Sequence, residues 1–394
     1  MTTTINNEHK KLNVPNLRFP EFQEEWEKTK IGDIAIVVGG GTPDTNTSQY
    51  WNGKIQWFTP SEIGRNKYVY NSVRTISEEG LNKSSAKLLP IGTILLSSRA
   101  TVGECSINKK ECTTNQGFQS LIPKENISNE FVYYLIQTKR KDLIRKSCGS
   151  TFLEISANEV RKIVVSIPSI KEQDKIAKLL SLLDDRIATQ NKIIEDLKKL
   201  KSAIIEKLYK EIQGTWYSYR QLFSIINERN KLLEYSNVLS ASQERGMVSR
   251  EDLNLDIHFE RSNISTYKIV KNGDYVIHLR SFQGGFAFSE KTGICSPAYT
   301  VLRPNNLLVY GYLSNYFTSR DFVKSLIIVT YGIRDGRSIN VDEWLDMKVV
   351  IPSKEQQTHI VNVIESIENK IKNEETYSNC LLNQKQYLLR QMFI

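Results

Sequence analysis

Two arginine-bearing segments carry side chains suited to contacting a polyanion. The first, SSRATVGE, spans Ser97–Glu104, and the second, HLRSFQGG, spans His278–Gly285. Each places an arginine after an expected strand, beside hydroxyl groups and glycine. A guanidinium can donate to both acceptors of a guanine edge, and glycine lets a loop approach closely. We therefore expect contact with DNA from Ser98, Arg99, Thr101, Arg280, Ser281 and Gln283.

Three further segments fit the same chemistry. Asn115 and Gln116 follow two threonines, and an amide can read adenine through two hydrogen bonds. The glycine-rich stretch YGIRDGRS offers Arg334 and Arg337. The run KRKDLIRK is the densest basic patch, and phosphate contact is its natural use; its candidates are Lys139, Arg140 and Lys141.

Each candidate also has a structural interpretation. Arg99 and Arg280 can bridge carboxylates, and Asn115 and Gln116 can cap a turn. The basic run can be an ordinary solvated helix face. Trp57 and Trp344 are expected in the core rather than as platforms for stacking bases.

Catalytic signatures are missing from the sequence. The Gly39–Gly41 run lacks the rest of a dinucleotide-binding motif and is expected to be a turn, and no P-loop occurs. There is no Pro-Pro dipeptide of the kind that amino-methyltransferases carry, and no convincing nuclease site. Five scattered cysteines and four scattered histidines favour neither a disulfide framework nor a metal site. We expect no catalytic residue, no bound metal and no cofactor on this chain.

The composition is that of a soluble protein with a mild basic excess. Lys and Arg number 53 against 44 acidic residues, and this balance favours polyanions. No stretch approaches the roughly 18 apolar residues of a membrane span. Residues 1–11 are polar and lack the apolar core of a signal peptide. A cytoplasmic location without membrane contact is expected.

The chain contains an internal repeat, which determines its expected organisation. Ile155–Ile187 matches Ile339–Ile371 without a gap at an offset of 184, and Gly92–Pro123 matches Gly273–Pro304 at an offset of 181. Trp26 and Trp216 are the expected opening residues of the two copies. The order is therefore globular unit, long helix, globular unit, long helix.

A proline–serine step precedes each expected long helix. Ser169 with Glu172, and Ser353 with Gln356, have the spacing of a capping box. Behind them, steps of four and three residues form a narrow seam that requires a partner helix. The seam includes Leu183, Ile187, Ile194, Leu197, Lys201, Ile204, Leu208, Ile367, Ile371, Glu374, Leu381, Leu388 and Met392.

We predict that the two helices pair antiparallel, with Lys201 opposite Glu374 and Gln190 opposite Lys385, because polar seam residues commonly set register. The alternative is that each seam packs only on its own globular unit. The 26 residues from Leu183 to Leu208 give about 39 Å at 1.5 Å per residue, close to the roughly 34–36 Å of one DNA turn. A spacer of this length suits two DNA-reading domains placed about one helical turn of DNA apart.

The expected fold class is α+β, with two globular domains separated by two long antiparallel coiled-coil helices and related by an internal pseudo-twofold repeat. Short β-rich runs broken by turns, with helix near Asn129–Lys146, indicate the class of each domain. The predicted boundaries are a flexible tail at 1–14, domain 1 at 15–166, a helix at 167–213, domain 2 at 214–350 and a helix at 351–394.

The assembled motifs resemble the specificity (S) subunits of type I restriction-modification systems along nearly the whole chain. In the first half the resemblance rests on LRFPEF, YWNGKIQWFTPSEI, ILLSSRATVGE, TNQGFQSLIP and IPSIKEQDKIAKLLSLLDDRI; in the second it rests on SPAYTVLRP and IPSKEQQTHI. The second copy departs from the first at Gln356-Gln357, where the first has Glu172-Gln173. The repeat symmetry is thus approximate.

The resemblance implies a noncatalytic subunit with two target recognition domains, each reading half of a split, asymmetric target in double-stranded DNA. Its partners would be two methyltransferase (modification) subunits that bind S-adenosylmethionine and methylate adenine. Restriction subunits would add translocation and cleavage with ATP and Mg²⁺. Two alternatives stay open, a stand-alone nuclease or methyltransferase with an atypical site, and a purely structural coiled-coil adaptor.

Overall fold

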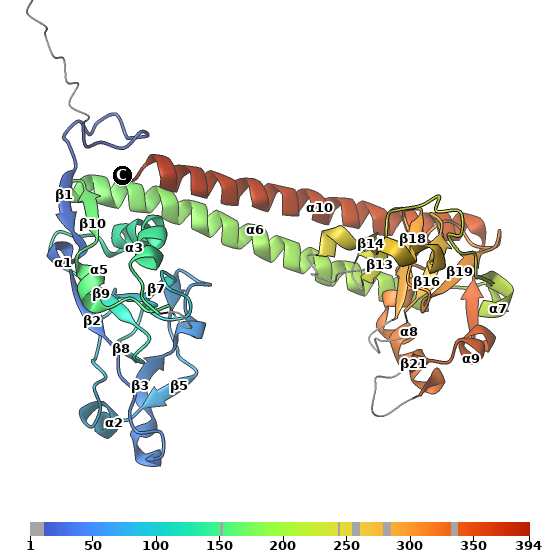
Figure 1. The fold of residues 1–394 in the computed structure, drawn as a ribbon, viewed down its shortest axis with the longest axis horizontal. Coiled ribbons are helices and arrows are strands. Elements are labelled where there is room, and N and C mark those ends of the chain that lie inside the picture. The colour runs from blue at the N-terminus through green and yellow to red at the C-terminus, as the bar shows by residue number, and fades with distance from the viewer. Residues whose placement is uncertain (1–11, 150–152, 243–244, 254–260, 279–284, 332–337) are drawn as a thin grey trace, which may run out of the picture. The chain divides into compact units, whose positions relative to one another are not determined.

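The structure, a computed structural model, describes residues 12–149, 153–242, 245–253, 261–278, 285–331 and 338–394 (Figure 1). The chain forms two compact units. Unit 1 contains residues 1–189 and 377–394, and unit 2 contains residues 190–376. Each unit holds one globular head and segments of both long helices, α6 (Ile170–Lys210) and α10 (Lys354–Gln391).

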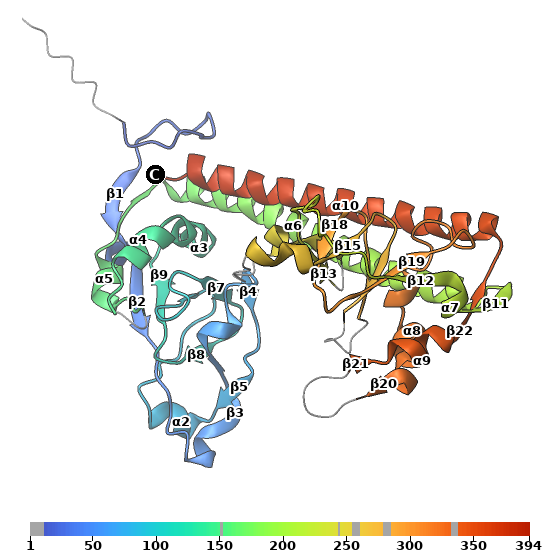
Figure 2. The same cartoon turned by 45° about the vertical axis from the view of Figure 1, so that its right-hand side comes forward.

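Head 1, the part of unit 1 outside the long helices, is built on a five-stranded sheet in the order β2-β9-β6-β7-β4. A second sheet, β5-β3-β8, lies at the end of the head away from α6 (Figure 1, Figure 2). The strands are β1 Glu27–Lys30, β2 Ala35–Gly39, β3 Trp51–Phe58, β4 Tyr68–Val69, β5 Arg74–Ile76, β6 Ile94–Leu96, β7 Cys105–Asn108, β8 Cys112–Thr114, β9 Gln119–Pro123 and β10 Val164–Ile167. The helices are α1 Ile31–Ile34, α2 Glu78–Asn82, α3 Asn129–Thr138, α4 Arg140–Arg145 and α5 Ala157–Arg161, with short 3-10 turns at Ser48–Tyr50 and Pro60–Glu62.

Head 2, the corresponding part of unit 2, repeats the central sheet as β12-β19-β16-β17. Its strands are β11 Thr215–Ser218, β12 Phe223–Ile226, β13 Leu239–Ser242, β14 Gly246–Ser249, β15 Lys268–Val270, β16 Tyr275–Ile277, β17 Phe286–Phe288, β18 Gly293–Cys295, β19 Thr300–Pro304, β20 Thr330–Tyr331, β21 Ser338–Ile339 and β22 Lys348–Ile351. The helices are α7 Tyr219–Leu222, α8 Arg320–Ser325 and α9 Val341–Asp346, with 3-10 turns at Arg250–Leu253, Arg261–Thr266, Tyr316–Thr318 and Leu326–Val329. Strands β6 to β9 recur as β16 to β19 at the offset predicted from the sequence.

The two long helices pack together and run antiparallel within each unit. In unit 1, Leu183 and Ile187 of α6 form an apolar cluster with Leu381 of α10. In unit 2, Gln190 contacts Glu374 and Lys201 contacts Glu368, so residue numbers rise along one helix as they fall along the other. None of the predicted seam residues is exposed. The antiparallel pairing is confirmed.

The predicted register, however, is wrong. Lys201 pairs with Glu368 at 2.5 Å rather than with Glu374, and Lys385 pairs with Asp184 at 2.6 Å rather than facing Gln190. Asp184 and Glu368 each lie one position beyond a seam leucine or isoleucine. Since a lysine on a partly buried seam needs a carboxylate, the acidic residues flanking the seam decide the pairing.

The helix starts agree with the predicted serines, but the capping box does not form in the first copy. Helix α6 begins directly after Ser169, yet the Glu172 carboxylate accepts two hydrogen bonds of 2.8 Å from Arg18 and one of 3.3 Å from Trp26. In the second copy only half of the box forms within the described residues: Ser353 Oγ accepts from the N–H of Gln356 at 3.3 Å, without a return bond from the Gln356 side chain. Glu172 therefore ties the N-terminal segment to α6 instead of capping the helix.

Trp26 and Trp216 are not counterparts. The register of β1 with β10 places Glu27 opposite Ile167, and that of β11 with β22 places Thr215 opposite Ile351. Because Ile167 and Ile351 are equivalent, β1 and β11 are equivalent strands. Trp26 lies just before β1, whereas Trp216 lies within β11. Trp26 is buried and Trp216 is 65% exposed.

Each head is packed by the end of one long helix. Phe393, just after α10, stacks on Phe131 of α3 with ring centres 5.2 Å apart. In unit 2, Tyr209 of α6 packs on Tyr312 at 5.5 Å. The two pairs occupy equivalent positions in the repeat, so the same aromatic contact joins head to helix in both units.

Candidate nucleic-acid interface

Loops from distant parts of the sequence meet in head 1. The N–H of Ser98 donates to Gly117 O at 2.8 Å, and the N–H of Ile155 donates to Ser98 O at 3.1 Å. The β6–β7 loop therefore lies between the loop that carries Asn115 and the segment before α5. Ser98 itself is fully buried, whereas Thr101 is exposed. Thr101 therefore lies at the surface of the loop, where its hydroxyl is hydrogen-bonded to Ser97 Oγ at 3.0 Å, whereas Ser98 lies in the interior.

Arg99 projects from this loop and is half-exposed. Its Nε lies 2.9 Å from Glu154 Oε1, and both side chains keep more than 40% of their surface in solvent. Arg99 thus bridges a carboxylate, as its structural interpretation expects. An exposed ion pair of this kind contributes little to stability and can be exchanged for another anion.

The two amide candidates differ in exposure. Asn115 Oδ1 accepts from the N–H of Gly117 at 2.9 Å, which is the turn role considered for it. Gln116 is exposed and its side-chain oxygen accepts from Thr42 Oγ1. Gln116 therefore presents the freer amide of the two.

The basic run begins at Lys139, the residue between α3 and α4, and continues through the short helix α4. Lys139 Nζ donates to the backbone oxygen of Ile394 at 2.7 Å, and burial lowers the pKa of Lys139. Arg140 pairs with Glu104 at 2.8 Å, and Lys141 is exposed. Through Glu104, Arg140 is attached to the same β6–β7 loop as Arg99.

The glycine run before Thr42 is a site of close backbone packing. A Cβ atom at Gly40 would lie 1.9 Å from Asn115 O, and one at Gly41 would lie 2.4 Å from the Ala86 nitrogen. Glycine is required here because no side chain fits. Gly39 ends β2 and no turn forms at Gly40 or Gly41, so the run is a closely packed connection after a strand rather than the expected turn.

In head 2, the candidates Arg280, Ser281, Gln283, Arg334 and Arg337 lie outside the described residues. The base of the first of these loops is described, and the N–H of His278 donates to Gly285 O at 2.7 Å. Ser97 and Glu104 make the equivalent bond at 2.8 Å in head 1. The loop bases are thus the same in both heads.

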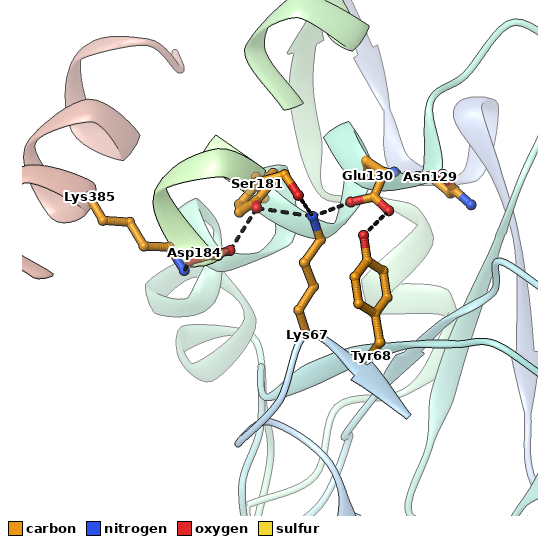
Figure 3. Close-up of polar contacts among 8 residues, drawn as sticks. Lys67, Tyr68, Asn129, Glu130, Ser181, Asp184 and Lys385 are labelled. Carbon is orange, nitrogen blue, oxygen red and sulfur yellow. Dashed lines mark hydrogen bonds and ion pairs between the residues drawn. The ribbon is translucent and has the colours of Figure 1, made fainter. Parts of the chain in front are cut away.

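A polar junction, absent from the predicted site, joins head 1 to α6 (Figure 3). Lys67 forms an ion pair with Glu130 of α3 and donates to Tyr134 at 3.1 Å and to Ser181 of α6 at 3.0 Å. The Lys67 side chain is only 9% exposed. A buried ammonium needs all three of its donors satisfied, and these partners supply that.

The junction continues to the second long helix. Tyr134 donates to Asp184 at 2.7 Å, and Lys385 of α10 pairs with the other oxygen of Asp184 at 2.6 Å (Figure 3). Burial, followed by the charge of Asp184, raises the pKa of Tyr134 well above its ordinary value. Tyr134 therefore stays a neutral donor, and α3, α6 and α10 are held in a defined arrangement within unit 1.

The described residues contain no group of three or more His, Cys, Asp or Glu side chains able to hold a metal ion. Among them, no helix has both the length and the apolar character needed to cross a bilayer. Trp57 and Trp344 are both buried, as expected for core residues.

The fold and the interface define a duplicated head-and-helix protein whose loops offer hydrogen-bond donors to a ligand. Residues 23–199 match the family model described as the type I restriction modification DNA specificity domain. The type I restriction enzyme MjaIX specificity subunit of Methanocaldococcus jannaschii is 40% identical over 201 residues. That match covers 50% of this chain and 45% of the relative, so the chain spans about half the length of this relative.

Two longer similarities extend over both repeats. The putative type I restriction enzyme MjaX specificity subunit of the same organism is 24% identical over 401 residues, covering 92% of this chain and 91% of the relative. The crystal structure of the type I restriction-modification S subunit from M. genitalium has a TM-score of 0.53 at 15% identity, over 97% of this chain and 99% of that chain. The chain is thus a relative of type I restriction enzyme specificity subunits, and the resemblance and the fold class predicted from the sequence are confirmed.

Proposed function

We propose that the chain reads a bipartite, asymmetric target in double-stranded DNA as the specificity subunit of a type I restriction-modification enzyme. The observation that carries the proposal is the duplication: two heads share the central sheet and the base of the same loop, and residues 23–199 match a DNA specificity domain. Two related heads suit a target whose two halves differ in sequence.

In this proposal, methylation, translocation and cleavage are carried out by partner subunits. Two modification subunits would supply S-adenosylmethionine and methylate adenine, and restriction subunits would supply ATP-driven translocation and Mg²⁺-dependent cleavage. This chain would contribute recognition alone and act in the cytoplasm, where it meets cellular DNA. The basic excess of 53 over 44 residues supports binding to DNA, and such binding weakens as salt rises.

Adenine methylation mapped after co-expression with the cognate modification subunit tests the proposal. A split motif with an unread gap is the expected result, and replacing residues 214–350 with those of a relative should change only one half of it. The chain expressed without the modification subunit is the control and should leave DNA unmethylated. Methylation or cleavage by the purified chain alone, with Mg²⁺ and S-adenosylmethionine, contradicts the noncatalytic role. Failure to bind duplex DNA in the assembled complex favours the adaptor alternative.

A further inference from the structure

Arg74 lies on β5, the edge strand of the small sheet, at the end of head 1 away from α6 (Figure 1, Figure 2). Its side chain is exposed, but one face of it is covered. The guanidinium carbon is 3.5 Å from the centre of the Trp51 ring and 5.5 Å from that of Trp57. Both indoles are buried, and their rings pack edge to face at 5.1 Å. The plane of the guanidinium is therefore set by a rigid aromatic platform.

The platform is fastened to the candidate interface. Trp57 Nε1 donates to Gly41 O at 2.9 Å, and the N–H of Gly41 donates to Thr114 O at 2.8 Å. The next residue, Thr42, contacts the exposed amide of Gln116. Arg74 thus belongs to the same connected set of loops as the candidates predicted from the sequence.

The backbone leading to Arg74 is also held. The N–H of Val73 donates to Glu62 Oε1 at 2.7 Å, and Ser72 Oγ donates to Arg74 O at 2.6 Å. The side chain therefore projects from a fixed point. Little conformational entropy remains to be lost when this arginine binds a ligand.

Arg74 differs from the other arginines of the interface in whether a nearby carboxylate neutralises its charge. Arg99 and Arg140 each have a carboxylate within 2.9 Å. No carboxylate among the described residues forms an ion pair with Arg74. Its guanidinium also donates no hydrogen bond to another described residue, and the in-plane N–H groups form a planar fork suited to two adjacent acceptors.

We propose that Arg74 contacts the DNA half-site read by head 1, presenting this fork to a pair of acceptors. The pair is either N7 and O6 of a guanine or two oxygens of one phosphate, since both match the guanidinium edge. The inference rests on the proposed function and adds a recognition residue to it. The competing explanation is that the stacked arginine only stabilises the small sheet.

The test uses the chain in complex with its cognate modification subunit and a duplex that carries the mapped methylation target. Arg74→Met keeps an apolar stem on Trp51 and removes the fork, whereas Arg74→Lys keeps the charge without the planar fork. Lys28→Met removes another exposed positive charge, from β1, and is the control. DNA affinity is measured at several salt concentrations and on targets with single base-pair changes, alongside thermal unfolding of each variant.

Contact with guanine predicts that Arg74→Met lowers affinity for the target roughly 5- to 150-fold and that the loss disappears on targets altered at one G·C pair. Arg74→Lys should not restore it. Contact with phosphate predicts an equal loss on every sequence, a salt slope reduced by about one and substantial retention by Arg74→Lys. Either pattern supports the proposal, with Lys28→Met remaining like the wild type.

A folded Arg74→Met variant that binds every target like the wild type overturns the inference. Should this variant fail to fold, Arg74→Lys provides the test: unaltered affinity, salt slope and base preference overturn the inference, and a change in any of them supports it. Absence of DNA binding by the wild-type complex is a separate result, because it removes the proposed function itself.

Discussion

Gln190 and Glu374 are repeat counterparts of each other, and in unit 2 they are also hydrogen-bonded partners. The Gln190 amide donates to Glu374 Oε2 at 2.5 Å. The hydrogen bonds from Lys370 and then from Gln190 lower the pKa of Glu374. The same offset of 184 relates two ion pairs, Asp184 with Lys385 in unit 1 and Glu368 with Lys201 in unit 2. The same kind of ion pair between the long helices thus occurs twice, once in each unit.

The two equivalent ion pairs should differ in strength. The side chains of Asp184 and Lys385 are 18% and 17% exposed, against 43% and 26% for Glu368 and Lys201. We expect Lys385→Ala to destabilise the protein by about 1–3 kcal/mol, since the largely buried Asp184 loses its ion-pair partner and keeps only the hydrogen bond from Tyr134. Lys201→Ala should cost less than about 1 kcal/mol because its partner is better solvated. Urea unfolding of both variants tests this, with Lys199→Ala as the surface control; equal losses would contradict the role of burial.

The aromatic contact at the end of each long helix should stabilise the head it touches. Phe393 is 7% exposed and packs on Phe131 and Trp26, so Phe393→Ala is expected to cost about 3–5 kcal/mol. Limited proteolysis should then release fragments from head 1 first. Tyr209→Ala should shift early cleavage to head 2. Tyr387→Ala, at a position on α10 that is 58% exposed, serves as the control and should leave both patterns unchanged.

A buried glutamine follows each helix start and ties a loop to it. Gln357 Nε2 donates to Leu307 O at 2.9 Å and to Pro352 O at 3.0 Å, while its oxygen accepts from the N–H of Val309 at 2.8 Å. Gln357→Met keeps the volume but leaves these backbone groups unpaired, so we expect a loss of about 1–3 kcal/mol in thermal unfolding. The exposed neighbour, Gln356→Met, should be neutral. A Gln357→Met variant as stable as the wild type would contradict this role of the glutamine.

Much of the fold was predictable because it depends on periodicity and repetition. The match between Ile155–Ile187 and Ile339–Ile371 identified the serines that directly precede the two helices, although the predicted boundaries at 167 and 351 lie three residues too early. The register was not predictable from seam residues alone. It depends on Asp184 and Glu368, which lie beside the seam and meet the lysines only when the helices pack.

In the candidate interface, too, some residues could be predicted from the sequence and others could not. Arg99, Asn115 and Gln116 could be found because arginine and amides on glycine-rich loops have a characteristic composition. Arg74 could not, since its sequence neighbours carry no such signal and its fixed orientation comes from Trp51, which lies 23 positions earlier. The Lys67 junction depends likewise on residues from α3 and α6 that only tertiary structure brings together.

The five thiols should fall into two classes of reactivity. Burial raises the pKa of Cys105, Cys112 and Cys295 to about 12, whereas Cys148 and Cys380 are exposed. The thiolate is the reactive form, and at pH 8 a thiol of pKa 12 is ionised in about one molecule in ten thousand. Alkylation followed by mass spectrometry should therefore label Cys148 and Cys380 in the native protein and all five in denaturant. Rapid native labelling of Cys112 would contradict its position in the core.

The ion pair between Arg99 and Glu154 allows recognition and structural roles to be separated with two substitutions. If Arg99 contacts DNA, its guanidinium must exchange Glu154 for the nucleic acid, and this exchange opposes binding. Glu154→Gln removes one negative charge and releases the arginine, so affinity of the complex for its target should rise. Arg99→Ala should lower affinity roughly 5- to 150-fold. Both side chains are more than 40% exposed, so thermal stability should change little in either variant.

Opposite shifts in affinity are the result that a purely structural Arg99 cannot produce, because breaking a structural pair from either side has the same consequence. Binding measured at two salt concentrations separates loss of a base contact from loss of charge, since only the latter changes the salt slope. Glu111→Gln also removes an exposed carboxylate from head 1, and Glu111 forms no ion pair within the described part of the chain, so this variant is the matched control for the added net charge. If it raises affinity as much as Glu154→Gln does, the gain comes from net charge, and Arg99 is not the group released.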